Sequence, residues 1–265
     1  MTRRRMVGPL LVTAAAIFGA CTNPSTSPTT VAALEFDTLP YPSIVTGDTM
    51  RDSLGNVAAL HAVVYNGSGG RIANPSVQYI ALDTGLTIGA GALLTAQARN
   101  GPVRLIASSG GVQSKPLTVL ITRRPDSVVV TGKPVDTLYY NYANGLTFDS
   151  PKLGVKLVTN DTGGGVTTTA GWLVSYQLLF HDQVVPLNDT TTVASLIHQN
   201  TASLSHVDTT AADGTAARRL RLRLARLTDT SSTARFVVIA TVRYKGAAVR
   251  GSPVTFVLYP RLKTP

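Results

Sequence analysis

The feature that most constrains the fold of this chain is a succession of short apolar runs, separated by turn residues, from about residue 33 onward. Residues 57–65, 76–82, 103–108 and 117–122 are such runs, and segments rich in Gly, Asn and Ser lie between them. This pattern predicts short strands joined by turns, and no long window has the period of an amphipathic helix. The sequence therefore predicts an all-β fold made of β-sandwiches.

The composition supports this interpretation. The chain is rich in Val, Thr, Leu, Ala, Gly and Ser, and its 265 residues include one Glu, one Trp and six Lys. Few Glu and Lys together with many Val and Thr favour strands over helices. After removal of an N-terminal export segment, the length suits two domains of about 100 to 150 residues, which need neither metal nor disulfides to bury a core.

The N-terminus has the organisation of a bacterial export signal. Residues 3–5 are arginines, and residues 6–20 form an apolar run that is shorter than the roughly 20 helical residues needed to cross a bilayer. The run ends in the sequence IFGAC, residues 17–21, which resembles the lipobox of bacterial lipoprotein precursors. The resemblance implies cleavage before Cys21 and attachment of lipid to its sulfur. Because Phe18 stands where the lipobox more often has Leu, ordinary signal-peptidase cleavage with an unmodified Cys21 is the alternative.

Cys21 is the only cysteine of the chain, so it has no partner for an intramolecular disulfide. The polar, Pro-containing segment that follows has little to bury and predicts a flexible tether over residues 21–34, after a signal peptide over residues 1–20. Each buried acyl methylene contributes about 0.8 kcal/mol, and two or three chains anchor a protein stably. We therefore expect a membrane-anchored lipoprotein of the cell envelope. Thr22, rather than Asp, follows the cysteine, which favours the outer membrane where one exists.

The mature chain contains an internal repeat of about the length of one immunoglobulin domain. Three segments recur: 44–48 as 129–133, 63–72 as 157–166, and 77–79 as 174–176. A break near residues 123–126 separates the two units. We therefore predict one domain over residues 35–123 and a second over residues 124–265.

The first unit resembles the bacterial immunoglobulin-like domains of invasin- and intimin-type surface proteins. The similar features are Thr46-Gly47-Asp48, the strand with Leu60, Ala62 and Val64, the Gly69-Gly70 hairpin, Val77-Gln78-Tyr79 and the closing hairpin over residues 103–120. The longer second unit is less similar, although residues 212–216 lead into a similar strand. The resemblance implies two tandem immunoglobulin-like sandwiches that act, without enzymatic activity, as a spacer, adhesin or partner-binding surface. Trp172 is then expected to be a core residue of a central strand, with a ligand-stacking role as the alternative.

Two Asp-Thr-Gly triplets occur, at residues 83–85 and 161–163. Aspartic proteases have two such triplets, whose aspartate carboxylates share one proton. Leu86 and Gly164 follow them here, where that family usually has Ser or Ala. The chain is also short for a two-lobed enzyme. We therefore interpret both triplets as turns.

The histidines do not form a recognisable metal motif. They are His61, His181, His198 and His206, and no pair has the spacing of a helical zinc site. His198, His206 and Asp208 are the one combination that would converge on a metal. The chain also lacks a Gly-x-Ser-x-Gly elbow and a phosphate-binding glycine loop, so we expect no enzyme, no cofactor and no metal.

The net charge is +10, and about +7 remains once the export arginines are removed, which favours anionic partners. Residues 219–224 alternate strictly between Arg and Leu, with Arg218 before them and Arg226 after them. On a strand, this period directs the leucines into the core and places the arginines in a solvent-facing row, about 7 Å apart. The candidate residues are Arg219, Arg221, Arg223 and Arg226. The row would bind an anionic glycan or lipopolysaccharide, or it protects a sheet edge from aggregation. An envelope protein is the other candidate partner, and nucleic acid is not expected.

Overall fold

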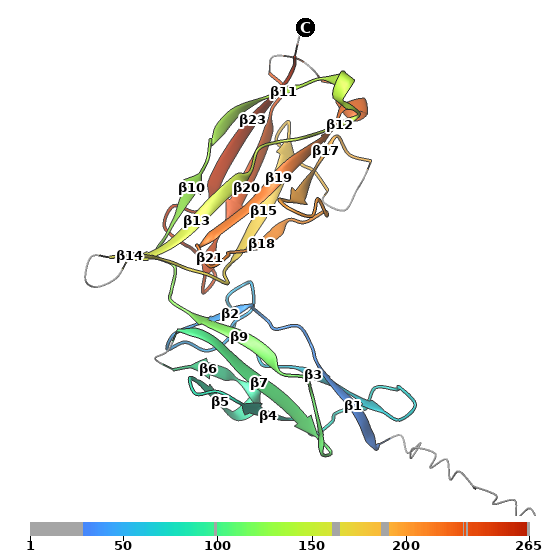
Figure 1. The fold of residues 1–265 in the computed structure, drawn as a ribbon, viewed down its shortest axis with the longest axis vertical. Helices are drawn as coiled ribbons and strands as arrows, with labels where there is room; N and C mark the ends of the chain where they lie inside the picture. Colours follow the sequence, from blue (N-terminus) through green and yellow to red (C-terminus); the bar gives the residue numbers. More distant parts are fainter. Residues whose placement is uncertain are drawn as a thin grey trace, which may run out of the picture.

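The computed structural model describes residues 29–97, 100–160, 165–186, 191–229, 231 and 233–263. Over these residues the chain forms strands and short 3-10 helices in two immunoglobulin-like β-sandwiches, so the predicted all-β fold class is confirmed (Figure 1). No helix in this part of the chain is long and apolar enough to cross a membrane. The predicted signal peptide, Cys21 and most of the predicted tether lie outside the described residues.

Domain 1 is built from three small sheets. Their strands are β2 (Ser43–Val45), β9 (Leu117–Thr122), β7 (Gly101–Ser109), β4 (Gln78–Ala81) and β8 (Val112–Gln113) in one sheet, β1 (Val31–Phe36) with β3 (Ala62–Asn66), and β5 (Leu86–Ile88) with β6 (Leu94–Ala96). The 3-10 helix η1 (Ala90–Ala92) precedes β6. Strand β1 begins inside the predicted tether, because Leu34 is buried with Ala62 and Val64 of β3. The expectation that residues 31–34 are tether is therefore wrong.

Domain 2 contains two larger sheets that face each other. We call them the β19 sheet and the β20 sheet after their central strands. The β19 sheet contains β10 (Ser127–Thr131), β13 (Leu153–Asn160), β19 (Thr215–Arg223), β12 (Thr147–Asp149), β14 (Val166–Thr168) and β17 (Ala194–His198). The β20 sheet contains β11 (Val135–Tyr140), β23 (Val254–Leu262), β20 (Phe236–Thr241), β15 (Leu173–Phe180), β16 (Gln183–Val184) and β18 (Val207–Thr209). Between them lies a core of alternating inward side chains, such as Leu220 and Leu222 of β19 opposite Phe236 and Val238 of β20.

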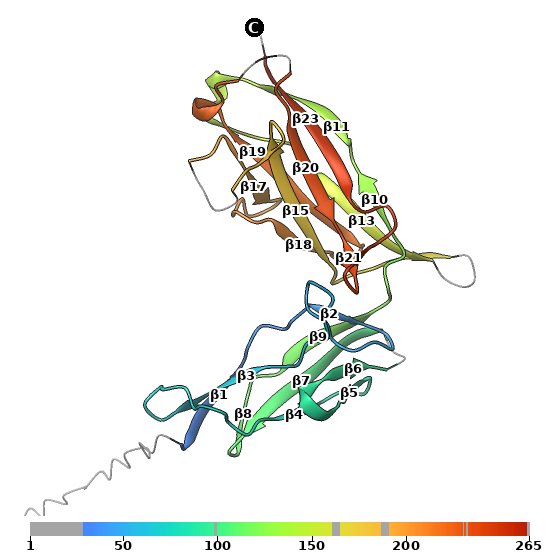
Figure 2. The same ribbon diagram turned by 180° about the vertical axis from the view of Figure 1, so that it is seen from behind.

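Three smaller elements complete domain 2. They are the ribbon of β21 (Arg243–Tyr244) and β22 (Ala247–Ala248), and the 3-10 helices η2 (Tyr142–Asn144) and η3 (Leu224–Arg226). The ribbon lies at the end of domain 2 that faces domain 1, whereas η2 and η3 lie at the far end (Figures 1 and 2). The boundary that we placed after residue 123 falls in the connection between β9 and β10.

Two of the three predicted repeat pairs occupy equivalent strands. Strands β3 and β13 each pair with the first strand of their domain, and β4 and β15 each pair with the penultimate long strand, β7 and β20, which in turn pairs with the last one. The third pair is not equivalent. Ile44 lies in β2, parallel to β9, whereas Val129 lies in β10, antiparallel to β13. The counterpart of β2 is β11, parallel to β23, so the shared Val-Thr-Gly sequence does not mark equivalent positions.

Candidate functional site

The arginine row lies on β19, with its leucines inward and fully buried. Arg219, Arg221 and Arg223 point to the outer side of the sandwich and are half-buried. Strand β19 pairs with β17 along one side and with β12 and β13 along the other. It is therefore an interior strand, and the interpretation of the row as edge protection is wrong.

Two of these arginines are held by contacts within the sheet. Arg221 makes a bidentate ion pair with Asp149 of β12, with both N–O distances at 2.7 Å. Hydrogen bonding to this carboxylate raises the pKa of Arg221 above its ordinary value. Arg223 donates to the carbonyl oxygen of Thr192 at 2.9 Å and to the hydroxyl of Ser195 at 3.2 Å. These two guanidinium groups stabilise the domain, and several of their N–H donors are already engaged in these contacts.

Arg219 and Arg226 are in a different situation. The Nε atom of Arg219 is buried without a hydrogen-bond partner among the described residues, and Arg226 is exposed at the end of η3. The structure thus brings three of the four predicted residues together on one strand and places the fourth beyond it. Because the Nε of Arg219 is buried, it is not accessible to a ligand, whereas the side chain of Arg226 is exposed.

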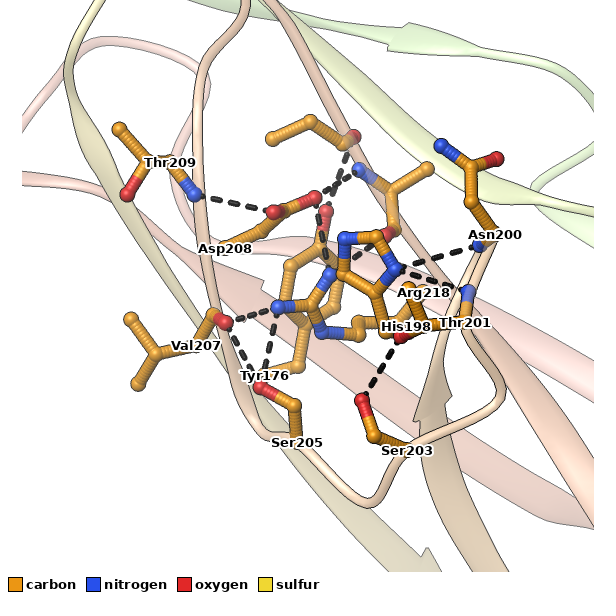
Figure 3. A network of polar contacts seen from close by, with 12 residues as sticks. Tyr176, His198, Asn200, Thr201, Ser203, Ser205, Val207, Asp208, Thr209 and Arg218 are labelled. Carbon is orange, nitrogen blue, oxygen red and sulfur yellow. Dashed lines mark hydrogen bonds and ion pairs between the residues drawn. The ribbon is translucent and has the colours of Figure 1, made fainter. Parts of the chain in front are cut away.

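Arg218, the residue before the row, points into the sandwich and is only 2% exposed. Its Nη1 lies 3.0 Å from Oδ2 of Asp208. Nη2 donates to the hydroxyl of Ser205 at 3.0 Å and to the carbonyl oxygen of Val207 (Figure 3). The guanidinium carbon lies 5.9 Å from the centre of the Tyr176 ring, which is within the range of a cation–π contact.

Asp208 is the acceptor at the centre of this buried network. Besides Arg218, it accepts the backbone N–H groups of Ala217 at 2.8 Å and Thr209 at 3.0 Å. Burial, and then the charge of Asp208, raise the pKa of Tyr176. Asp208 belongs to β18 in the β20 sheet and Arg218 belongs to β19, so the ion pair joins the two sheets. We interpret this ion pair as a structural connection, because among the described residues the Nε of Arg218 is the one buried polar atom of this network without a hydrogen-bond partner.

The residues considered for metal binding do not form such a site. Nδ1 of His198 accepts the backbone N–H groups of Asn200 and Thr201, each at 3.2 Å, and Asp208 is engaged with Arg218. Among the residues that the structure describes, no three His, Cys, Asp or Glu side chains are grouped to hold a metal. The idea that His198, His206 and Asp208 converge on a metal is therefore wrong.

The first Asp-Thr-Gly triplet has a structural role. Asp83 accepts the backbone N–H of Arg104 at 2.9 Å and forms an ion pair with its guanidinium at 3.0 Å, so it connects the turn after β4 to β7. The second triplet lies outside the described residues.

The second candidate site is the junction between the two domains, where Trp172 is buried. Tyr41, from the loop between β1 and β2, accepts the backbone N–H of Leu173 at 2.9 Å. Its ring meets Trp172 edge-on with centroids 5.4 Å apart, and Tyr244 lies on another side of the indole at 6.0 Å. The indole Nε1 donates to the carbonyl oxygen of Arg243 at 3.2 Å. Trp172 is thus a core residue, as predicted, but both domains form its surroundings, and it precedes β15 instead of lying within it.

Asp48 is the polar centre of the junction. Its carboxylate accepts from Arg51 of its own domain at 3.2 Å, and from the Tyr244 hydroxyl at 3.0 Å and Lys245 at 3.2 Å in domain 2. Burial raises the pKa of Asp48, but hydrogen bonds from Arg51, the Thr49 N–H, Tyr244 and Lys245 outweigh burial and hold that pKa below its ordinary value. The same hydrogen bond favours the charged form of Lys245 and raises the pKa of this lysine.

The two backbones come into direct contact beside this cluster. A Cβ atom on Gly55 would lie 2.1 Å from the amide nitrogen of Gly246, and Gly55 has a φ of +95°. Only glycine combines this conformation with such a close approach. The cavity beside Asp48 has a volume of about 40 Å³, enough for a few waters at most. A wider hollow of about 400 Å³, lined by Leu54 of domain 1 and Leu173 of domain 2, also opens between the domains. One apolar cluster runs through the junction and includes Ile44 of domain 1 and Val174 of domain 2, so the two domains share a packed apolar core at the junction.

Comparison with known proteins finds no matching family model and no matching curated protein. The chain is similar to a solved structure of domains 4 and 5 of the S-layer protein SbsC, with 12% identity over 87% of this chain and 98% of that one, at a TM-score of 0.30. It is similar to the Yersinia pseudotuberculosis adhesin InvE, with 11% identity over 88% of this chain and 61% of that one, at a TM-score of 0.32. It is also similar to the Escherichia coli adhesin FdeC, with 14% identity, coverage of 85% and 63%, and a TM-score of 0.29. At these identities and TM-scores, the likenesses carry no argument about what this chain binds.

Proposed function

We propose that this chain is a non-enzymatic lipoprotein of the cell envelope whose two immunoglobulin-like domains form a stiff spacer. The observation that carries this proposal is the packed junction, in which Trp172 is enclosed by both domains and Asp48 is bonded to both. Domains joined by a simple linker move independently unless their interface is extensive and apolar. A continuous apolar cluster through the junction opposes such motion.

The shape of the molecule supports the same role. The described chain begins with β1 at one end of the molecule, and the C-terminal end of β23 lies at the opposite end (Figure 1). A lipid on Cys21 would place domain 1 next to the membrane and extend domain 2 away from it. The spacer would thereby present the surfaces of domain 2 to envelope partners.

Stiffness is tested by measuring the distribution of distances between the domains. Spin labels at Lys115→Cys and Lys152→Cys, both exposed positions, report on it in a Cys21→Ser background. We expect a narrow distribution by double electron–electron resonance. Gly55→Ala should broaden it, because the added Cβ collides with domain 2. The matched control is Gly69→Ala, which imposes a similar strain at φ +80° with no atom within 4 Å. A broad distribution in the unmodified junction would overturn the stiff spacer.

The anchor is tested separately, by mass spectrometry of the mature N-terminal peptide from membrane-extracted protein. We expect a diacyl or triacyl mass on Cys21, and loss of both lipid and membrane retention in Cys21→Ser. An unmodified N-terminus in the soluble fraction would instead make this a released secreted protein.

A second candidate function, capture of an anionic polymer, has support from two observations. Residues 124–265 contain 15 Lys and Arg against nine Asp, whereas residues 35–123 contain six against five acidic residues. Arg226 is also exposed at the end of η3. Retention on immobilised heparin tests this idea. We expect Arg219→Gln with Arg226→Gln to lower the salt concentration needed for elution if the strand binds polyanions. Arg235→Gln with Arg250→Gln, two other exposed arginines, is the control for the loss of two charges. Equal elution of all three proteins would reject capture by this strand.

A further inference from the structure

The wider hollow between the domains has walls of different chemistry. Its volume of about 400 Å³ lies within the range of about 300–1,000 Å³ that is common for sites of small ligands. Domain 1 contributes Ser53 and Leu54, from the loop between β2 and β3, and domain 2 contributes the outward side of β15 and β20 at the end that faces domain 1. Ligand sites occur preferentially at such boundaries between domains.

The sheet side of the hollow carries neutral hydrogen-bonding groups. Ser175 and Gln177 alternate with buried residues along β15 and point outward. Thr241 of β20 lies directly opposite Ser175, so the two hydroxyl groups share one face of the sheet. Within the described part of the chain, the side chains of Ser175, Gln177 and Thr241 form no hydrogen bond. Each of them can both donate and accept, as can a backbone amide group of a ligand.

Arg243 supplies the positive charge of the hollow. It is exposed, it follows Thr241 by two residues, and among the described residues no Asp, Glu, Lys or His lines the hollow with it. Within the same part of the chain, its guanidinium forms one long hydrogen bond, at 3.4 Å from Nη1 to the carbonyl oxygen of Gly246. Because arginine binds carboxylates bidentately, the remaining N–H groups of Arg243 match a carboxylate of a ligand.

Leu54 and Leu173 form the apolar part of the hollow. Leu54 is 71% exposed, although its loop is held in place: Asp52 accepts the backbone N–H of Leu54 at 2.9 Å, and Gly55 lies against Gly246 of domain 2. Leu173 is partly buried and lines the hollow from domain 2. An aliphatic group placed between the two leucines would remove apolar surface of both domains from water, which favours binding.

We propose that this hollow binds the C-terminal residue of a peptide that ends in an aliphatic side chain. Such a residue carries a carboxylate for Arg243, a backbone amide for the polar side chains of β15 and β20, and an aliphatic group for the two leucines. A fatty acid would leave the polar side chains without partners, which costs free energy, and a sugar acid would place hydroxyl groups against the leucines. This binding function goes beyond the spacer role, and it depends on the packed junction but not on the lipid anchor.

The first test is a nuclear magnetic resonance titration of the mature Cys21→Ser chain with the peptide acetyl-Ala-Ala-Leu. We expect saturable binding with a dissociation constant below about 1 mM. The C-terminal amide of this peptide, which lacks the carboxylate, and acetyl-Ala-Ala-Gly, which lacks the aliphatic group, should each bind at least about tenfold more weakly. Equal binding of the acid and the amide, tighter binding of glucuronate or octanoate than of the peptide, or no saturation at millimolar concentrations would overturn the proposal.

The second test locates the site with variants at exposed positions, which should leave the fold intact. Arg243→Gln should weaken binding of the acid at least about tenfold and leave binding of the amide almost unchanged, because it removes the partner of the carboxylate. The matched control is Arg250→Gln, an exposed arginine outside the hollow. Leu54→Ser should weaken binding several-fold, whereas Leu146→Ser, at a leucine of similar exposure (67%) next to η2, should not. If either variant behaved as its control does, the hollow between the domains would not be the site.

Discussion

Two carboxylates hold separate parts of this molecule together in different surroundings. Asp208 joins the two sheets of domain 2 through Arg218, which is almost completely buried. Asp48 joins the two domains through Tyr244 and Lys245, and its lysine partner is nearly half exposed. The buried pair has lost its hydration and depends on its partners, whereas the junction cluster retains contact with water. We therefore expect the first to determine whether domain 2 folds and the second to determine how the domains are held.

The largest effect is expected for Arg218→Leu. The substitution leaves the carboxylate of Asp208 buried without its ion-pair partner, which costs about 3–5 kcal/mol of unfolding free energy. Urea denaturation of domain 2 measures this loss. Adding Asp208→Asn should recover much of it, because the unpaired charge is then removed. If Arg218→Leu alone were neutral, the contrast between the two carboxylates would disappear.

A smaller effect is expected for Asp48→Asn, which should loosen the junction and leave both domains folded. We expect a loss of about 1 kcal/mol in the coupling between the domains, the range of charge-assisted hydrogen bonds that remain near solvent. The spin-label distances described above should broaden while the circular dichroism spectrum stays unchanged. Unfolding of either domain would show that the junction is needed for folding itself.

The same carboxylate predicts a pH dependence. Because the folded pKa of Asp48 is depressed, its stabilising contribution is complete above the ordinary carboxyl pKa of about 3.9. The contribution is lost as the pH falls through the lower, folded value. The distance distribution of the unmodified junction should therefore broaden below about pH 4. Asp48→Asn should show little further change in this window, and identical pH profiles for the two proteins would contradict the assignment to Asp48.

The smallest effect is expected for Arg221→Gln on the outer side of β19. Its ion pair with Asp149 is partly solvated, and such pairs contribute about 0–1 kcal/mol. Urea denaturation of the single and double variants, Arg221→Gln with Asp149→Asn, gives the coupling energy. If this coupling energy were as large as that between Arg218 and Asp208, solvent exposure would not explain a difference in strength between the two ion pairs.

Much of the fold was predictable from the sequence, because strands and turns are encoded locally. The alternation of residues 218–223 predicts which leucines are buried, and by the same parity it directs Arg218 inward. An inward arginine is stable only with a buried partner. Asp208, on a neighbouring element, could not be identified as that partner without the pairing of β18 with β15.

The junction was beyond prediction for a related reason. Asp48 and Lys245 are separated by almost 200 residues, and each lies in an ordinary turn sequence. Tyr41, Trp172 and Tyr244 come from three separate segments, and no local period relates them. The hollow between the domains is likewise lined by side chains of both domains, so no single segment of the sequence indicates it.

The parallel pairing of β11 with β23 has a mechanical consequence. When the two ends of the molecule are pulled apart, β11 is drawn toward domain 1 and β23 toward the C-terminus. The two strands then slide past each other along their length. Their six registered residue pairs share the load and resist together, instead of opening one after another as in a peeled hairpin. A spacer anchored at one end and loaded at the other would therefore bear tension through shear, and its lifetime under force would depend on the rate at which this pair of strands breaks.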